Sequence, residues 1–302
     1  MASSKELIRG TLWTRLVEQT ELALSLGALQ SIPTDYEFVE DAGVRFLVRT
    51  LVNLSRKDEE RKRRKVEEER TGVEVNPFLP YERELFVADI SDTHLALLNK
   101  FNVVEHHLLI VTRHFEDQDI LLNRSDFEAM WLSMGEYESL AFYNGGRVAG
   151  ASQRHKHLQQ IPLPMGVSGP RIPVEPLFRG TTVTNRPVRV NGLPFRHAFV
   201  RMEFEEGAGV EEKSAASADL FREMLVFTGM GVPADNRQSG PYNLMVTPEW
   251  MFLVPRSGEF FQGVSVNSLG FAGALLVRNE EDMERLKQVG PMTVLKEVAM
   301  PE

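Results

Sequence analysis

The sequence has no cysteine among its 302 residues. Disulfides, thiolate metal sites and cysteine nucleophiles are therefore excluded, and any nucleophile must be another side chain. No apolar run reaches the roughly 18 residues that cross a bilayer, and the N-terminal stretch MASSKELIRG lacks the apolar core of a signal peptide. Together these absences predict a cytoplasmic protein that does not bind membranes.

The sequence also lacks an excess of basic residues. Lysine and arginine total 34 against 43 aspartates and glutamates, and the formal net charge is −9. Proteins that bind nucleic acid broadly usually present a basic face, so no nucleic-acid partner is expected. A small polyanionic ligand is still compatible with this balance, because it needs only a local basic pocket.

The most informative stretch is NGGRVAGASQRHKHLQQIPLP, which runs from Asn144 to Pro164. Its alternation predicts a strand that places His155, His157 and Gln159 on one face and the residues between them on the other. An imidazole near neutral pH can act as a nucleophile, a base or a metal ligand. The glycines just upstream allow backbone N–H groups to approach a phosphate.

The remaining patterns predict an α+β arrangement. The first half reads as a helix over residues 4–29, a strand over 44–51, an antiparallel pair over 94–98 and 107–112, and a helix from Ser125 to about residue 143. The run Arg56–Arg70 carries both charge signs densely and is expected to be a solvated helix or loop.

The second half begins after a stretch rich in proline, glycine and arginine, which is predicted to be a crossover. The elements expected beyond it are a strand over 195–204, a helix over 217–228, a strand pair over 242–247 and 250–254, a strand over 274–277, and helices from about 280 to the end. His107–Arg113 has the same pattern as Trp250–Arg256, which predicts two related modules, the second without a histidine pair.

The segment AGASQRHKHLQQIPLP resembles the active-site segment of the ATP adenylyltransferases, also called diadenosine tetraphosphate phosphorylases, a branch of the histidine-triad superfamily. Asn76–Gln118 and Val266–Val277 resemble the same family, so the resemblance covers most of the chain. It implies a histidine-triad-like α+β fold, with antiparallel sheets, flanking helices and two diverged modules fused in one chain. The implied division is a catalytic module over 1–165 with an N-terminal helix and a charged loop, a crossover over 166–190, and a C-terminal ATP adenylyltransferase module over 191–302.

The resemblance also implies residue roles. His157 would attack the α-phosphorus of an adenylyl unit, His155 would fix the orientation and tautomer of its ring, and Gln159 would hydrogen-bond a phosphoryl oxygen. An amide cannot donate a proton as an acid at neutral pH, which is consistent with transfer to phosphate rather than hydrolysis. The substrate-binding positions that the resemblance implies are Lys57, Asn99, Lys100, Asn144, Gly150, Ala151, Ser152, Gln153, Asn267, Ser268, Leu269 and Arg278.

The expected ligands are nucleotides: diadenosine tetraphosphate, ATP, ADP and AMP, together with phosphate. No tightly bound cofactor and no protein-held metal is expected, although a divalent cation such as Mg²⁺ can accompany the nucleotide. A monomer is expected. Basic side chains from a set that includes Lys57, Lys100, Arg154 and Arg278 are predicted to converge on His157, with Lys156 pointing away.

Three alternatives stay open at this point. The histidine pair could belong to a metal site, with help from His106, His107 or His114, although zinc usually needs three or four protein ligands. The enzyme could be a hexose-1-phosphate uridylyltransferase, although those relatives typically place proline between the histidines. A non-catalytic nucleotide sensor would keep the fold without turnover. Histidines outside the motif, at positions 94, 106, 107, 114 and 197, are interpreted as structural or surface residues.

Overall fold

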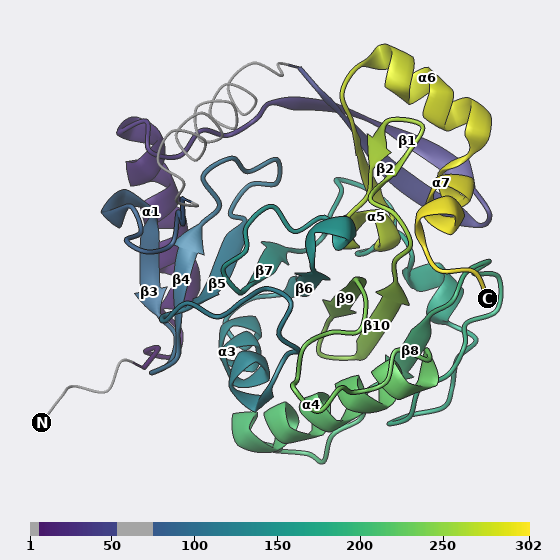
Figure 1. The fold of residues 1–302 in the computed structure, drawn as a ribbon. Coiled ribbons are helices and arrows are strands. Elements are labelled where there is room, and N and C mark those ends of the chain that lie inside the picture. Colours follow the sequence, from purple (N-terminus) through teal and green to yellow (C-terminus); the bar gives the residue numbers. More distant parts are fainter. Residues whose placement is uncertain (1–5, 53–74) are drawn as a thin grey trace, which may run out of the picture.

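The computed structural model describes residues 6–52 and 75–302, arranged as Figure 1 shows. The charged run Arg56–Arg70, which includes Lys57, lies outside the described residues. The described chain forms one large antiparallel sheet with helices on one face and a smaller sheet over part of the other face. Within it, no helix is both long and apolar enough to cross a membrane.

The main sheet has eight strands. In spatial order they are β3 (Phe86–Asp89), β4 (His94–Leu98), β5 (Leu108–Thr112), β7 (His157–Pro162), β6 (Ser139–Gly145), β9 (Tyr242–Val246), β10 (Trp250–Pro255) and β8 (Ala198–Arg201). The strands from β4 to β10 in this order are buried almost throughout. Strands covered on both faces need side chains suited to burial on both, which explains their near-continuous apolar runs.

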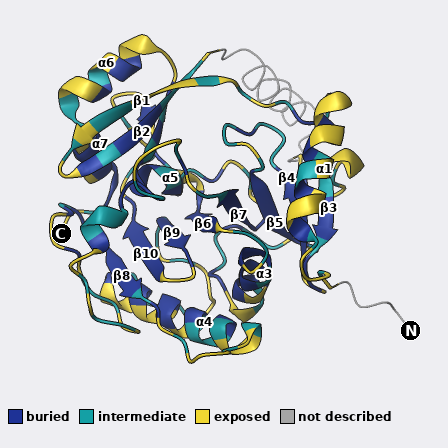
Figure 2. Ribbon diagram, turned by 180° about the vertical axis from the view of Figure 1, so that it is seen from behind, coloured by how far each residue is buried: buried dark blue, intermediate teal, exposed yellow. Residues whose placement is uncertain are grey.

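One face of this sheet packs against α1 (Leu12–Ser25), α3 (Arg124–Met134) and α4 (Val210–Phe227) in a shared apolar core. The outward sides of α1 and α4 are exposed (Figure 2). Helix α3 begins with a capping box, in which the side chain of Asn123 accepts from the helix and Asp126 accepts from the backbone of Asn123. Satisfying these N–H groups fixes where the helix starts.

Two separate apolar cores cover the opposite face. The larger lies under a second sheet of β1 (Thr34–Asp41), β2 (Val44–Leu51) and β13 (Ala274–Val277). The remaining named elements near it are β11 (Phe260–Phe261), β12 (Val264–Ser265), α5 (Ser268–Phe271), α6 (Glu280–Val289) and α7 (Pro291–Val298). The smaller core gathers Phe78 with residues of β4 and β5. By strand alternation, polar side chains of β6 and β7 occupy the sheet between the two cores.

The strand order contains a repeat, but the strands that correspond to each other differ from those predicted. In the first half, β5 is followed by α3 and the pair β6–β7, and β7 lies beside β5; in the second, β8 is followed by α4 and the pair β9–β10, and β10 lies beside β8. The halves meet where β6 pairs with β9, and α3 contacts α4 above that junction. The predicted match of His107–Arg113 with Trp250–Arg256 is therefore wrong, because β10 corresponds to β7.

Several predicted boundaries are also wrong. Helix α1 starts only at Leu12, because Gly10 has a positive φ, and it ends at Ser25, before Gly27. The helix predicted from Ser125 to about residue 143 starts one residue earlier and stops at Met134, where Gly135 caps it. Residues 139–145 become the central strand β6, because the sheet buries both faces of that segment.

The second half shows similar shifts of boundary. The helix predicted over 217–228 already begins at Val210, so α4 is longer at its N-terminal end. The strand predicted over 195–204 is reduced to Ala198–Arg201. The predicted crossover contains one short 3₁₀ helix, Glu175–Phe178.

Candidate active site

His157 begins β7 and is almost completely buried, with 4% of its surface exposed. Its ring Nδ1 lies 2.8 Å from the carbonyl oxygen of His155. Because a carbonyl can only accept, Nδ1 must carry the hydrogen, and the lone pair of the neutral ring is on Nε2. Burial lowers the pKa of His157 to about 4, against the effect of the carbonyl and with a smaller contribution from His155. The ring is therefore a neutral imidazole near pH 7, with an unprotonated nitrogen.

The side chain of His155 is anchored away from this nitrogen. Its Nε2 lies 2.9 Å from the carbonyl oxygen of Thr112 and 3.2 Å from that of His114, and its Nδ1 lies 3.0 Å from Nδ2 of Asn76. Burial lowers the pKa of His155, opposed by these carbonyl contacts. The strand starts at His157, and His155 makes only an isolated bridge to Asp117. The predicted effect on the tautomer of His157 therefore comes from the backbone carbonyl of His155, whereas its imidazole holds the preceding loop.

Asn76 and Phe78 contact these histidines. Asn76 supplies the contact to His155, and the ring of Phe78 lies 5.6 Å from that of His155 and 5.4 Å from that of His157, centroid to centroid. This aromatic contact contributes to the desolvation of both imidazoles. Sequence reasoning assigned neither residue a role, although both lie in the stretch that resembles the family.

The pairing of β6 and β7 ends immediately beside His157. The last paired residues are Phe142 and Gln159. Beyond them, the buried side chain of Gln118 bridges the separated strands: its Oε1 accepts from the N–H of His157 at 2.9 Å, and its Nε2 donates to the carbonyl of Asn144 at 3.0 Å. The Gln118 amide thus takes the place of a peptide group. It satisfies both backbones while keeping them apart next to His157.

Gln159 is oriented by a residue that was interpreted as merely structural. Its Oε1 lies 3.0 Å from Nε2 of His107, and Nδ1 of His107 lies 3.3 Å from Nδ2 of Asn99. Since the Asn99 amide nitrogen can only donate, the contacts define one direction: Asn99 donates to His107, and His107 donates to Gln159. The amide oxygen of Gln159 is then occupied, and its donor nitrogen is the end left for a ligand. Asn99 is therefore connected to Gln159 by hydrogen bonds through His107.

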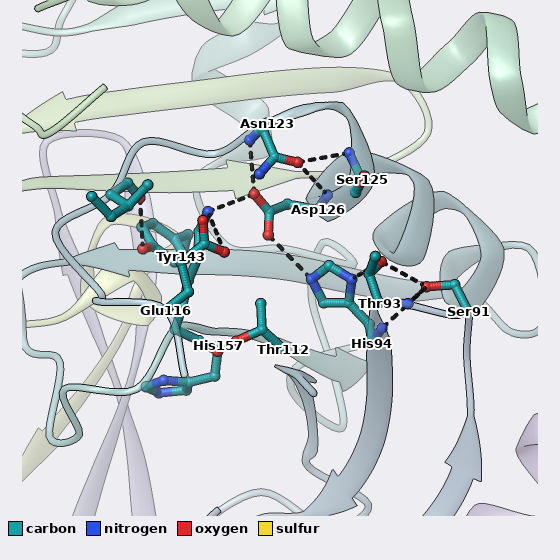
Figure 3. A network of polar contacts seen from close by, with 12 residues as sticks. Ser91, Thr93, His94, Thr112, Glu116, Asn123, Ser125, Asp126, Tyr143 and His157 are labelled. Carbon is teal, nitrogen blue, oxygen red and sulfur yellow. Dashed lines mark hydrogen bonds and ion pairs between the residues drawn. The ribbon is translucent and has the colours of Figure 1, made fainter. Parts of the chain in front are cut away.

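Lys156 projects to the opposite face, where it contacts Asp126, which confirms the predicted alternation. Figure 3 shows Asp126 and its partner His94 away from the ring of His157. Its ammonium is fully buried, 2.7 Å from Oδ2 of Asp126 and 3.4 Å from a carboxylate oxygen of Glu116. His94 contacts the other oxygen of Asp126 at 3.1 Å. Burial acts to raise the pKa of Asp126, but the hydrogen bond from His94 and the charge of Lys156 together lower it. His157 thus follows a residue that is held in the core by a buried ion pair.

The predicted phosphate loop and the predicted C-terminal segment lie against each other. Oδ1 of Asn144 accepts from the backbone N–H of Ser268 at 3.0 Å, from its hydroxyl at 2.8 Å and from Nδ2 of Asn243 at 2.9 Å. Gly150 has φ +94°, and a Cβ there would stand 2.7 Å from Cβ of Asn267, so this close approach requires glycine. Residues 144–150 and 267–268, more than 100 positions apart, therefore pack directly against each other.

The backbone of the loop is less available than predicted. The N–H of Gly150 donates to the carbonyl of Arg147 at 2.9 Å, and that of Ala151 donates to the carbonyl of Gly146 at 3.2 Å. These two groups are therefore used inside the loop rather than presented to a phosphate. Ser152 is exposed and Gln153 half-buried. Leu269, half-buried, packs at the edge of the larger core.

The predicted basic side chains are held by carboxylates. Lys100 pairs with Glu82, Arg154 with Asp117 and Arg278 with Asp282. Their convergence on His157 stays a prediction. In the part of the chain that the structure describes, no group of three or more histidine, aspartate or glutamate side chains could hold a metal ion.

Comparison with known proteins agrees with this architecture. Residues 2–180 match the Ap4A phosphorylase N-terminal domain, and residues 191–301 match the ATP adenylyltransferase C-terminal domain. The chain therefore belongs to the Ap4A phosphorylase family, as the resemblance of its motifs implied.

Two curated relatives come from Saccharomyces cerevisiae. Diadenosine 5',5'''-P1,P4-tetraphosphate phosphorylase 2 is 29% identical over 70% of this chain and 72% of its own length. Protein APA1 is 28% identical over 64% of each chain, slightly less than two thirds of its length. Among solved structures, yeast Ap4A phosphorylase Apa2 in complex with Ap4A superposes with a TM-score of 0.76 at 22% identity, over 98% of this chain and 99% of that one. The complex of the same protein with AMP gives the same score at 23% identity over 98% and 99%. At this identity the superposition shows a shared fold.

Proposed function

We propose that this protein is a diadenosine tetraphosphate phosphorylase, a nucleotidyltransferase that also catalyses the reverse adenylyl transfer. The observation that carries the proposal is the state of His157: a neutral imidazole, with Nδ1–H engaged by the carbonyl of His155 and Nε2 unprotonated. The two matching family domains and the named yeast relatives support the choice of substrate.

The first step uses the lone pair of Nε2. Nε2 of His157 attacks the α-phosphorus of one adenylyl unit, a new N–P bond forms, and the P–O bond to the departing ATP breaks with its electrons on ATP. The ring becomes an N-adenylyl imidazolium, whose positive charge the carbonyl of His155 stabilises through Nδ1–H. Splitting one displacement into two in this way lowers the barrier of each.

The second step returns the ring to its starting state. An oxygen of inorganic phosphate attacks the same phosphorus, the N–P bond breaks, and ADP leaves.

Gln159 can donate an N–H to the transferring phosphoryl group but cannot supply an acidic proton. ATP is a good leaving group that needs little protonation, so an amide is sufficient at this position. Any Mg²⁺ would arrive bound to the nucleotide. We also propose that the enzyme is monomeric and cytoplasmic.

Product analysis tests the proposal. Incubation with diadenosine tetraphosphate and phosphate should yield equimolar ATP and ADP, and omission of phosphate should stop turnover after one equivalent of ATP per enzyme. With substrate labelled at the α-phosphorus, that stalled enzyme should hold an acid-labile label, as a phosphoramidate would. Rapid phosphate-independent release of AMP would instead identify a hydrolase, and absence of any turnover would favour a nucleotide sensor.

A further inference from the structure

A buried cation of the second module lies behind the site. Arg256, which directly follows β10, is only 2% exposed. Its guanidinium donates to the carbonyls of Val298 at 3.1 Å, Val266 at 2.9 Å and Gly258 at 2.7 Å, and to Oδ1 of Asn243. Within the described ranges no carboxylate lies at salt-bridge distance from it. Burial lowers the pKa of Arg256 to about 9, with a smaller opposing effect from Glu259, so the side chain stays charged near pH 7.

The contact with Arg256 fixes the direction of the Asn243 amide. A guanidinium can only donate, so Oδ1 of Asn243 faces Arg256 and its nitrogen faces the other way. That nitrogen donates to Oδ1 of Asn144 at 2.9 Å and to the carbonyl of Ala149 at 2.8 Å. The sheet register pairs Asn144 with Asn243 at the junction of the two modules. The contact with Arg256 therefore determines which end of the Asn243 side chain on β9 faces Asn144 on β6.

Asn144 is the end of this chain of hydrogen bonds. Its Oδ1 accepts hydrogen bonds from Nδ2 of Asn243 and from the backbone N–H and the hydroxyl of Ser268. The two N–H groups of the Asn144 amide therefore point away from Asn243 and Ser268. Asn144 is 1% exposed, and the side-chain hydrogen bonds that it makes within residues 6–52 and 75–302 all run to Oδ1. The bridging side chain of Gln118 contacts the carbonyls of both Asn144 and His157, which places these residues on neighbouring strand ends. By alternation, the Asn144 side chain lies on the same sheet face as His157.

We propose that Arg256 is a positioning residue for adenylyl transfer. Through Asn243 it holds the amide donors of Asn144 toward the phosphoryl group that His157 attacks, and it adds positive charge on that side of the site. Preorganised donors of this kind stabilise the charge that develops in a transition state without having to reorient. The inference rests on the proposed function, because it takes the adenylyl phosphorus as the target.

The decisive variant is Asn243→Asp. An aspartate can still accept from Arg256, so the buried cation keeps a partner. The carboxylate has no N–H for Asn144, however, and it neutralises the charge of Arg256. We expect kcat to fall about 100-fold, the size of effect seen when one such donor is removed, with KM changed by less than about threefold. If Arg256 served only to hold its neighbouring loops, Asn243→Asp would leave kcat unchanged and overturn the proposal.

A second pair of variants keeps the test informative if that protein folds poorly. Arg256→Lys retains a buried cation and a donor for Asn243, whereas Arg256→Gln retains a donor without charge. We expect the lysine variant to keep at least tenfold more of the wild-type kcat than the glutamine variant; equal kcat values would contradict the role of the charge. Arg201→Gln is the matched control, since Arg201 also donates to carbonyls in the second module, those of Thr181 and Phe178. It should leave kcat unchanged.

The readout separates this inference from the proposed function. Each variant is assayed for kcat and KM of ATP release from diadenosine tetraphosphate in the presence of phosphate, with its melting temperature measured in parallel. Failure of the proposed function would appear as a wild-type protein that releases no ATP. Failure of the Arg256 inference would appear as an active wild type with unaffected Asn243→Asp.

Discussion

His157 in the first module and His197 in the second are held by the same local device. In each case ring Nδ1 donates to the carbonyl two residues earlier, at 2.8 Å for His157 and 2.7 Å for His197. Burial lowers the pKa of both rings. The difference is at Nε2, which in His197 accepts the backbone N–H of Val190 at 2.8 Å. Within residues 6–52 and 75–302, Nε2 of His157 has no such donor. The tautomer is thus fixed in both rings, and the difference leaves Nε2 of His157 for the proposed chemistry.

The strands β7 and β10 extend this comparison. They occupy equivalent places in the two modules, yet β7 reads HLQQIP and β10 reads WMFLVP. On the face that carries the site, β10 presents Trp250, Phe252 and Val254 to the core under the smaller sheet. In the proposed mechanism the second module therefore contributes support, through Asn243, Arg256 and Ser268, and the first module contributes the reacting histidine.

Replacing His157 should give the largest effect. His157→Ala removes the nitrogen that we propose forms the adenylyl intermediate, so kcat should fall by at least about 10⁴-fold in the product assay. The fold should persist, because the ring faces the site rather than the helix-side core. His197→Ala is the comparison: it should lower the melting temperature but keep kcat within about threefold. Substantial activity in His157→Ala would refute the mechanism.

Among the residues that the structure describes, the buried ion pair behind β7 has no counterpart behind β10, where Met251 and Leu253 face the same core. Lys156→Met leaves the carboxylate of Asp126 buried without its cation, and breaking such a pair typically costs about 3–5 kcal/mol of unfolding free energy. Urea denaturation measures this loss. Adding Asp126→Asn, which removes the unpaired charge, should recover part of it. A loss below about 1 kcal/mol would show that the ion pair contributes little.

Much of the fold follows from local patterns. The alternation over 155–159 placed Lys156 on the opposite face from the histidines, and the strand pair β4–β5 was read from its apolar runs. The segment over 139–145 was misassigned, because an apolar run buried on both faces has no distinguishing period and only the assembled sheet decides its conformation.

The site was predictable only in part. The motif indicated His157 and Gln159, but their partners Gln118 and His107 lie 39 and 52 positions away and are defined by tertiary contacts. Arg256 was noted only as the end of a strand pattern. A single sequence does not distinguish a buried arginine bonded to carbonyls from an exposed one, so its place behind the site required the structure.

The pKa of His157 offers a direct measure of its environment. Burial places that pKa at about 4, so the ring should titrate well below the ordinary value of about 6.5. Between these values the unfolded chain binds the proton and the folded chain does not. The stabilising contribution is therefore complete above about pH 6.5 and is lost as the pH falls toward 4. Histidine NMR should show this resonance, assigned by its absence in His157→Gln, and titration near 6.5 would contradict the buried neutral ring.

The smallest effect is expected from the residue that orients Gln159. His107→Phe removes the donor to Oε1 of Gln159, so the amide can rotate and present its oxygen to the phosphoryl group; kcat should fall about tenfold, corresponding to roughly one hydrogen bond. His107→Asn keeps a donor and should retain more activity. The matched control is the neighbouring His106, which contacts Thr20 on α1 and has φ +55°, a conformation that asparagine tolerates. His106→Asn should leave kcat unchanged, and equal losses at both positions would mean that the β4–β5 connection, rather than the orientation of Gln159, limits the reaction.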